Sequence, residues 1–191
     1  MTEQLLPIVQ TNNKGTLYFM STTIVTKDQL LNLLPSRAVI ILRGCPGAGK
    51  TTFIANLEEY LGSPFAPFEV VSADHFFVEE KTGNYVFNSH LLGQAHAACK
   101  DNFEYFTNMH GKRRPLYVVV DNTNTTMKEM QPYIAQAEKT GWDVIIVTFL
   151  TPAALAAKRN IHGVPKEKVL EMSDRVVKTE IPEYLTHYVI E

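Results

Sequence analysis

A glycine-rich turn between an apolar segment and a helical segment is the feature that most constrains this chain. Residues 38–42 are continuously apolar, as in a buried central strand of a parallel sheet, and a helical pattern follows from Thr52. The turn carries the pattern G-x-x-x-x-G-K-T, formed by Gly44, Cys45, Pro46, Gly47, Ala48, Gly49, Lys50 and Thr51. In the order strand, turn, helix, this pattern is typical of a loop that binds the phosphates of a nucleoside triphosphate.

The chemistry of this loop predicts what each part of it binds. Its glycines let the backbone curl, so that the N–H groups of residues 44–52 form a nest for anions at the start of a helix. Lys50 is expected to reach the β- and γ-phosphates, and the Thr51 hydroxyl to coordinate Mg²⁺. We therefore predict that residues 44–52 bind ATP or another nucleoside triphosphate with Mg²⁺. A chance glycine-rich turn is the alternative, and the flanking strand disfavours it.

The composition suits a globular domain and narrows the classes of partner. The chain has 191 residues, of which 45 % are hydrophobic and 20 % charged, enough for one domain with a sizeable core. A formal net charge of −2 means that any nucleic-acid site must be a local patch. Cys45 and Cys99 lie far apart in the sequence, which disfavours a structural disulfide. No apolar run has the length of a membrane span, and the first residues lack the basic segment that begins a secretory signal. We expect a cytoplasmic protein without a membrane partner.

Alternating strand and helix patterns predict an α/β fold. Apolar runs indicate strands at 38–42, 68–72, 116–120 and 143–150, and helical patterns indicate helices at 52–61, 89–109, 127–140, 152–159 and 166–178. This order is typical of a P-loop NTPase three-layer sandwich with a central parallel sheet and a helical lid.

The first 34 residues do not follow this alternation. We assign residues 1–34 to a small N-terminal extension and residues 35–191 to a P-loop kinase domain. The extension is predicted to hold a hairpin around the loop 11–15 and a short helix, 27–34, that opens with a capping box and stops at Pro35.

Two acidic residues stand where predicted strands end. Asp74 follows the strand 68–72, and Asp121 closes the strand 116–120. Ligands of open α/β sheets bind at this edge. Asp121 is expected to support the metal, as in the Walker B role, and a plain helix N-cap by Asp121 or Thr125 is the alternative.

Phosphoryl transfer needs an acceptor base and a cation on the transferring group. Asp74 can take the proton of the acceptor hydroxyl, and Arg159, beyond the last crossover, can lie over the nucleotide phosphates. His75 could hydrogen-bond the substrate, although a packed or capping histidine is the alternative. No G-K-x-D signature specifies guanine, which disfavours a GTPase switch.

Five motifs in this order resemble those of the polynucleotide 5′-hydroxyl kinase-like P-loop family over residues 37–178. They are residues 42–52, residues 72–77 (S-A-D-H-F-F), residues 94–96 (Q-A-H), residues 120–125 (V-D-N-T-N-T) with 129–133, and residues 159–165 (R-N-I-H-G-V-P). This family includes the polynucleotide kinase of phage, the kinase domains of tRNA ligases, zeta-toxin-like kinases and eukaryotic AAA-type P-loop proteins. The resemblance implies an Mg²⁺-dependent kinase of nucleic-acid repair.

The resemblance also implies roles for individual residues. Lys50, Asp74 and Arg159 would be catalytic, with Asp74 activating the acceptor 5′-hydroxyl and Arg159 on the nucleotide phosphates, and Thr51 and Asp121 would hold the metal. Contacts with the substrate are expected from Asp74, His75, Asn122, Thr123, Asn124 and Arg175.

One departure from the family concerns the acceptor. The phage enzyme carries an arginine shortly after the acceptor aspartate, whereas residues 75–78 here include none. Arg43, Arg175 or the basic turn 112–114 could replace it, although a solvated turn is the simpler interpretation of 112–114.

Three functions fit these residues. The first is transfer of the γ-phosphoryl group of ATP to the 5′-hydroxyl end of DNA or RNA. The second is the same transfer to a nucleoside or nucleotide sugar, as in zeta-toxin-like kinases. The third is a nucleotide-binding module that presents a surface to a partner, which the set Lys50, Thr51, Asp74, Asp121 and Arg159 disfavours.

Overall fold

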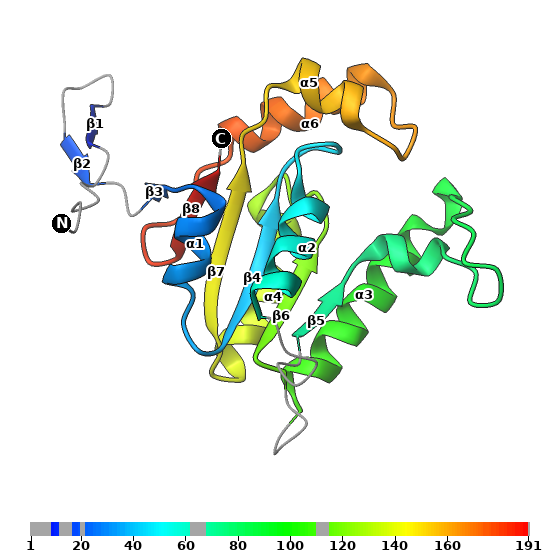
Figure 1. Ribbon diagram of the computed structural model, residues 1–191, viewed down its shortest axis with the longest axis horizontal. Helices are drawn as coiled ribbons and strands as arrows, with labels where there is room; N and C mark the ends of the chain where they lie inside the picture. Colours follow the sequence, from blue (N-terminus) through cyan, green and yellow to red (C-terminus); the bar gives the residue numbers. More distant parts are fainter. Residues whose placement is uncertain (1–8, 12–16, 20–21, 62–67, 110–114, 191) are drawn as a thin grey trace.

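A parallel sheet forms the centre of the molecule (Figure 1). The computed structural model describes residues 9–11, 17–19, 22–61, 68–109 and 115–190. Six strands lie in the order β3-β8-β7-β4-β6-β5, and every neighbouring pair is parallel. Their bounds are β3 Thr22–Ile24, β4 Ala38–Arg43, β5 Phe68–Val71, β6 Tyr117–Asp121, β7 Asp143–Phe149 and β8 Thr186–Ile190.

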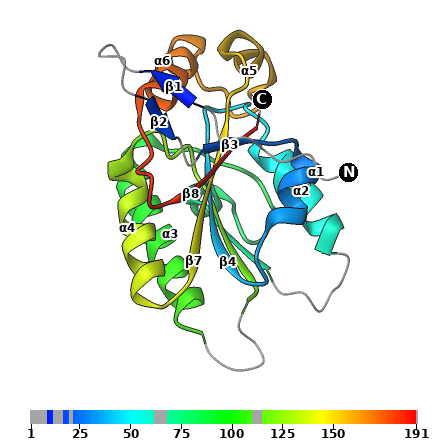
Figure 2. The ribbon, with the colours of Figure 1, turned by 90° about the vertical axis from the view of Figure 1, so that its left-hand side faces the viewer.

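Helices cover both faces of this sheet (Figure 2). Helices α1 (Lys27–Leu33) and α2 (Lys50–Leu61) lie on one face, and α3 (Leu92–Thr107) and α4 (Met127–Lys139) lie on the other. Successive residues of β4 alternate between the two cores: Ile40 packs with the α1 and α2 side, whereas Ile41 packs with the α3 and α4 side. All six residues of β4 are buried. The predicted P-loop three-layer sandwich is confirmed.

Two helices lie beyond the carboxyl ends of the strands (Figure 1). They are α5 (Ala153–Arg159) and α6 (Lys166–Lys178), at the positions where the sequence predicts helices of a lid. Two short 3₁₀ turns, Ala73–Phe77 and Ser89–Leu91, follow β5 and precede α3. The helix expected from residue 89 therefore begins as a 3₁₀ turn and becomes α-helical at Leu92.

The N-terminal residues are partly described. Strands β1 (Val9–Thr11) and β2 (Leu17–Phe19) pair antiparallel, as the expected hairpin requires, and most of its connecting loop lies outside the described residues. The capping box of Thr26 and Gln29 opens α1 as predicted. Strand β3 joins the main sheet through β8, and Leu30 of α1 is fully buried in the core. Residues 22–34 thus share the sheet and core of the P-loop domain, and the division at residue 34 stays a prediction.

A buried polar network crosses the sheet below the phosphate loop. The Arg43 guanidinium donates to the carbonyls of Val176 and Thr179 at the end of α6 and to the Thr148 hydroxyl at 3.3 Å. His187 shares hydrogen bonds with Thr148 (2.8 Å) and Thr22 (2.9 Å). Burial and the neighbouring Arg43 lower the pKa of His187 to about 4, so its ring is neutral at pH 7. The network joins four strands to α6.

Candidate active site

The glycine-rich loop runs from the end of β4 into α2, as its sequence predicts. Gly47 (φ +80°) and Gly49 (φ +101°) adopt the left-handed backbone that glycine tolerates without strain. The Gly44 N–H donates to the Thr123 carbonyl at 2.9 Å, and the Thr151 hydroxyl donates to the Ala48 carbonyl at 2.8 Å. The loop is therefore held from two sides by the segments that follow β6 and β7.

Helix α5 rests directly against the loop. A Cβ atom on Gly47 would lie 2.1 Å from the carbonyl oxygen of Ala156 and 3.0 Å from the backbone nitrogen of Asn160. Arg159 stands at the end of α5, and its side chain is exposed. The predicted lid arginine thus belongs to a helix in contact with the loop.

Lys50 begins α2 and turns back over the loop. Its ammonium donates to the carbonyls of Gly44 (3.1 Å) and Cys45 (3.3 Å). Burial lowers the pKa of Lys50, and the negative charges of Asp121 and Asp74 act against that shift. Two carboxylates, one at the end of β6 and one on the turn after β5, therefore act on the charge of this lysine.

Asp121 lies at the end of β6 with its carboxylate largely removed from water. Burial raises its pKa, while the charge of Lys50 lowers it. The N-cap of α4 is Thr126, with Glu129 completing the capping box, so the alternative that Asp121 or Thr125 caps this helix is wrong. Within the described ranges, no group of three or more His, Cys, Asp and Glu could hold a metal. The Mg²⁺ site on Thr51 and Asp121, whose oxygens suit that ion, stays a prediction.

Asp74 sits on the 3₁₀ turn that follows β5 and is exposed to solvent. Its backbone N–H donates to the Ser72 hydroxyl at 3.2 Å, which fixes the start of the turn. The Tyr85 hydroxyl donates to Asp74 Oδ1 at 3.0 Å. Asp74 Oδ2 has no hydrogen-bond partner among the residues that the structure describes, so it is open to an acceptor.

The contact of Tyr85 with Asp74 has no signal in the sequence. The segment of Tyr85 reaches Asp74 because Val78 and Tyr85 form an isolated antiparallel bridge that folds residues 78–85 back on themselves. The Tyr85 ring also contacts the ring of His162, with centroids 5.5 Å apart. The glycine and asparagine at 83–84 indicate the turn, but its length and register carry no signal that a tyrosine would meet Asp74.

The residues after β6 that are expected to contact substrate form hydrogen bonds mainly with other groups of the protein. Asn122 accepts from the Ala73 N–H at 2.9 Å and donates to the Tyr133 hydroxyl at 3.3 Å. Asn124 is 2 % exposed and donates to the Leu42 carbonyl at 2.7 Å. This geometry favours a structural role for both asparagines, which tie β6 to β5 and β4, over direct contact with substrate.

The basic candidates for the acceptor are placed differently. His75 is exposed, and its charge acts on Asp121. Arg175 lies on α6 within 4.0 Å of Glu171. Arg43 is 2 % exposed and bonded to α6, so it does not replace the missing phosphate arginine, which corrects that expectation. Residues 112–114 lie outside the described part of the chain.

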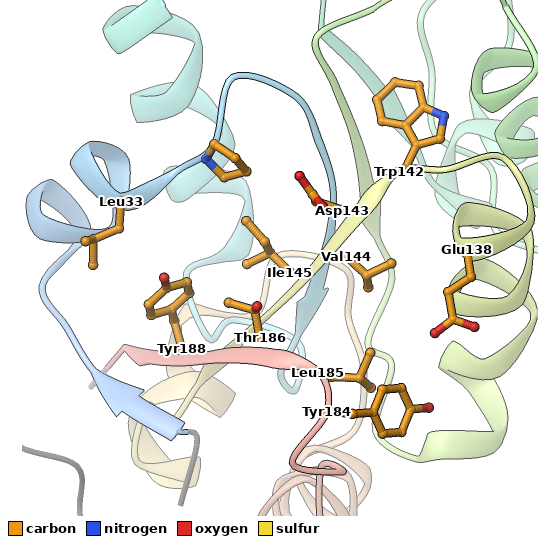
Figure 3. Close-up of a pocket in the computed structure, with 11 residues that line it drawn as sticks. Leu33, Glu138, Trp142, Asp143, Val144, Ile145, Tyr184, Leu185, Thr186 and Tyr188 are labelled. Atoms are coloured by element: carbon orange, nitrogen blue, oxygen red, sulfur yellow. The ribbon is translucent and has the colours of Figure 1, made fainter.

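The described surface also has a pocket far from this site (Figure 3). It has a volume of about 420 Å³ and is lined by residues from α1, α4, β7 and β8 and from the segments that precede these two strands, among them Leu33, Trp142 and Tyr184. Asp143 and Thr186 mark the amino ends of their strands, whereas the phosphate loop lies at the carboxyl end of β4. This pocket is therefore separate from the candidate active site.

A family model described as AAA domain matches residues 39–179. The chain belongs to this family. The matched range begins in β4 and ends just after α6, so it includes the phosphate loop, both strand-end carboxylates and Arg159. The glycine-rich loop at the centre of the site therefore lies within the region that the AAA domain model matches.

Two curated relatives contain a similar region. NEDD4-binding protein 2 of Homo sapiens is 34 % identical over 143 residues, which cover 70 % of this chain and 7 % of that protein. YLP motif-containing protein 1 of Homo sapiens is 27 % identical over 158 residues, which cover 73 % of this chain and 7 % of that protein. The chain thus spans about 7 % of the length of these relatives.

Solved structures share the fold at low sequence identity. The APS kinase CysC of Mycobacterium tuberculosis, in complex with AMPPNP and APS, has a TM-score of 0.53 and 13 % identity, covering 82 % of this chain and 90 % of that chain. AvrRxo1-ORF1:-ORF2 with ATP has a TM-score of 0.52 and 19 % identity over 79 % of this chain and 51 % of that chain. The Pnkp1/Rnl/Hen1 complex has a TM-score of 0.50 and 19 % identity, covering 68 % of this chain and 40 % of that chain.

Among the described residues, no helix is long and apolar enough to cross a membrane.

Proposed function

We propose that this domain transfers the γ-phosphoryl group of ATP, or of another nucleoside triphosphate, to a 5′-hydroxyl end of DNA or RNA. The observation that supports it most is that Asp121, at the end of β6, and Asp74, on the turn after β5, both lie near enough to Lys50 for their charges to raise its pKa. A module that only binds nucleotide needs the loop, Lys50 and Asp121. It does not need an exposed carboxylate such as Asp74 beside them.

The residues divide between donor and acceptor. The loop N–H groups and Lys50 would hold the β- and γ-phosphates, and Arg159 would neutralise charge on the transferring group. Asp74 Oδ2 would accept the proton of the acceptor hydroxyl, whose oxygen forms the new P–O bond while the bond to the β-phosphate oxygen breaks. The products are a 5′-phosphate end, ADP and the proton on Asp74.

The metal has a matching donor set. Thr51 begins α2 and Asp121 ends β6, and they offer a hydroxyl and a carboxylate, the oxygen ligands that Mg²⁺ accepts together with water and phosphate. Bound there, Mg²⁺ would neutralise charge on the phosphates. A cytoplasmic role in nucleic-acid repair is part of this proposal.

The test is an acceptor screen with γ-labelled ATP. The unmodified protein should label 5′-hydroxyl oligonucleotides, whereas Asp74→Asn should retain ATP binding and lose about 10²–10⁴ of the transfer rate, the range for a general base. Lys50→Ala should lose ATP binding as well. Tight ATP binding without transfer to any DNA or RNA end would reject the proposal.

A small acceptor is the second candidate. Residues 75–78 carry no arginine, and Arg43 is committed to α6. The screen should therefore include nucleosides and nucleotide sugars. An oligonucleotide acceptor should bind more weakly as salt rises, in proportion to the phosphates contacted, and a small neutral acceptor should show little salt dependence.

A further inference from the structure

Exposed apolar side chains gather in the segment that follows Asp74. Fifteen large hydrophobic residues are exposed among those described, and six of them fall within residues 76–92: Phe76, Val78, Tyr85, Val86, Phe87 and Leu92. A concentration of exposed apolar groups on a soluble protein marks a binding surface.

The aromatic rings of this segment are held in place by one buried ring. Phe77 is 5 % exposed, and its centroid lies 5.5 Å from Phe76, 6.1 Å from Tyr85 and 5.2 Å from Phe87. The Val86 N–H donates to the Phe77 carbonyl at 2.8 Å, which fastens the backbone as well. Phe76, Tyr85 and Phe87, here called the aromatic platform, are 41 %, 38 % and 53 % exposed. Rings fixed in this way lose little conformational entropy when they bind a partner.

The aromatic platform is continuous with the proposed acceptor site. Tyr85 belongs to the platform and also donates its hydroxyl to Asp74 Oδ1. Phe76 lies two residues after Asp74 on the same 3₁₀ turn. A flat group bound on these rings would therefore place a hydroxyl attached to it within reach of the Asp74 carboxylate.

Charge argues for a ring contact at this position. The segment 74–92 carries more carboxylates than ammonium groups: Asp74, Glu79, Glu80 and Lys81. Such a surface repels phosphate groups. A terminal nucleoside with a free 5′-hydroxyl has no phosphate on that side, and every nucleobase offers a π face.

We propose that the aromatic platform stacks the terminal nucleobase of the acceptor, beside a segment, residues 75–78, that contains no arginine. This inference rests on the proposed kinase function. It adds that the acceptor must carry a base at its reacting end, with little preference for which base. The proposal would be wrong if the aromatic platform instead bound a protein partner or a lid of this chain.

Kinetics with two acceptors test the proposal. Phe87→Leu and Phe76→Leu keep apolar bulk against Phe77 and remove the π face. Each should raise the KM for a 5′-hydroxyl oligonucleotide by about tenfold or more, while the KM for ATP stays unchanged. Tyr105→Leu, which changes an exposed ring late in α3, is the matched control and should leave both constants unchanged. An oligonucleotide with an abasic 5′ end should be a poor acceptor for the unmodified protein.

Binding provides a readout that does not depend on transfer. An oligonucleotide with 2-aminopurine at its 5′ end should lose fluorescence on binding because the base stacks, and Phe87→Leu should restore it. 2-Aminopurine placed near the 3′ end should not respond. Equal transfer to abasic and normal ends, or unquenched 5′-terminal 2-aminopurine in the bound complex, would overturn this inference and leave the kinase proposal standing. Transfer to no end at all would instead reject the kinase proposal.

Discussion

Gly47 has no room for a side chain. Its φ of +80° disfavours any other residue, and a Cβ atom there would meet the Ala156 carbonyl oxygen at 2.1 Å. Gly47→Ala should therefore push α5 away from the loop, lower the free energy of unfolding by about 1–3 kcal/mol and abolish ATP binding. Gly93→Ala is the matched control, because a Cβ atom on Gly93 meets nothing within 4 Å and its backbone is helical. Urea unfolding and ATP titration measure both; normal ATP binding by Gly47→Ala would contradict the account.

Tyr85 should position the Asp74 carboxylate. Tyr85→Phe removes the hydroxyl that donates to Asp74 Oδ1 and keeps the ring. We expect kcat to fall about tenfold to a hundredfold, as for loss of a hydrogen bond to a charged group, while the KM values of ATP and acceptor stay unchanged. Steady-state kinetics with both substrates measure the split. A change in acceptor KM alone would assign Tyr85 to binding only.

His187 should make stability depend on pH. Its pKa is about 4 in the folded protein and about 6.5 when unfolded, so the unfolded chain binds the extra proton between these values. Stability conferred by the neutral ring is present above pH 6.5 and is lost as pH falls towards 4, at up to about 1.4 kcal/mol per pH unit. His187→Gln keeps polar contacts for Thr22 and Thr148 without titrating. Urea unfolding of both proteins from pH 7 to 5 should show the steeper loss in the unmodified protein, and parallel profiles would exclude this role.

Helix α6 depends on a residue from the sheet. The carbonyls of Val176 and Thr179 at its end accept from the Arg43 guanidinium. Arg43→Met would leave these acceptors unpaired, and we expect the free energy of unfolding to fall by about 2–4 kcal/mol. Arg43→Lys keeps the charge without the forked guanidinium donor, so its free energy of unfolding should fall less. Hydrogen exchange over residues 166–178 should rise in Arg43→Met, and unchanged exchange there would refute the link.

Some elements could be predicted from sequence and others could not. Strand β4 is continuously apolar because it is buried on both faces, so its pattern was clear. Strands β3 and β8 were missed, since Thr22 and His187 look polar and exposed in sequence. In the structure they satisfy one another by a hydrogen bond, and His187 is 7 % exposed. A polar pair from opposite ends of the chain leaves no local periodicity.

In the candidate site, too, some residues could be predicted from sequence and others could not. Lys50, Asp74 and Asp121 were predictable because each stands at the end of a strand or in a motif with known geometry. Tyr85 was not, because its contact with Asp74 depends on how residues 78–85 fold back. The internal use of Asn124 depends on its left-handed backbone (φ 46°) and on the distance to β4, which sequence does not specify.

The whole molecule brings the phosphate loop and Asp74 to one edge of a parallel sheet. In the proposed function, the phosphate loop and α5 would form the donor side, and Asp74 with the aromatic platform would form the acceptor side. Tyr85 links Asp74 to the segment that follows α5, because its hydroxyl donates to Asp74 and its ring contacts His162, three residues after Arg159.

The most direct test of this account is the chemical identity of the product. The protein should be incubated with ATP, Mg²⁺ and a 5′-hydroxyl oligonucleotide, and the oligonucleotide analysed by mass spectrometry and by digestion with a nuclease that requires a 5′-phosphate. We expect one added phosphoryl group at the 5′ end, present with the unmodified protein and absent with Asp74→Asn. ATP consumption with an unmodified oligonucleotide would contradict it.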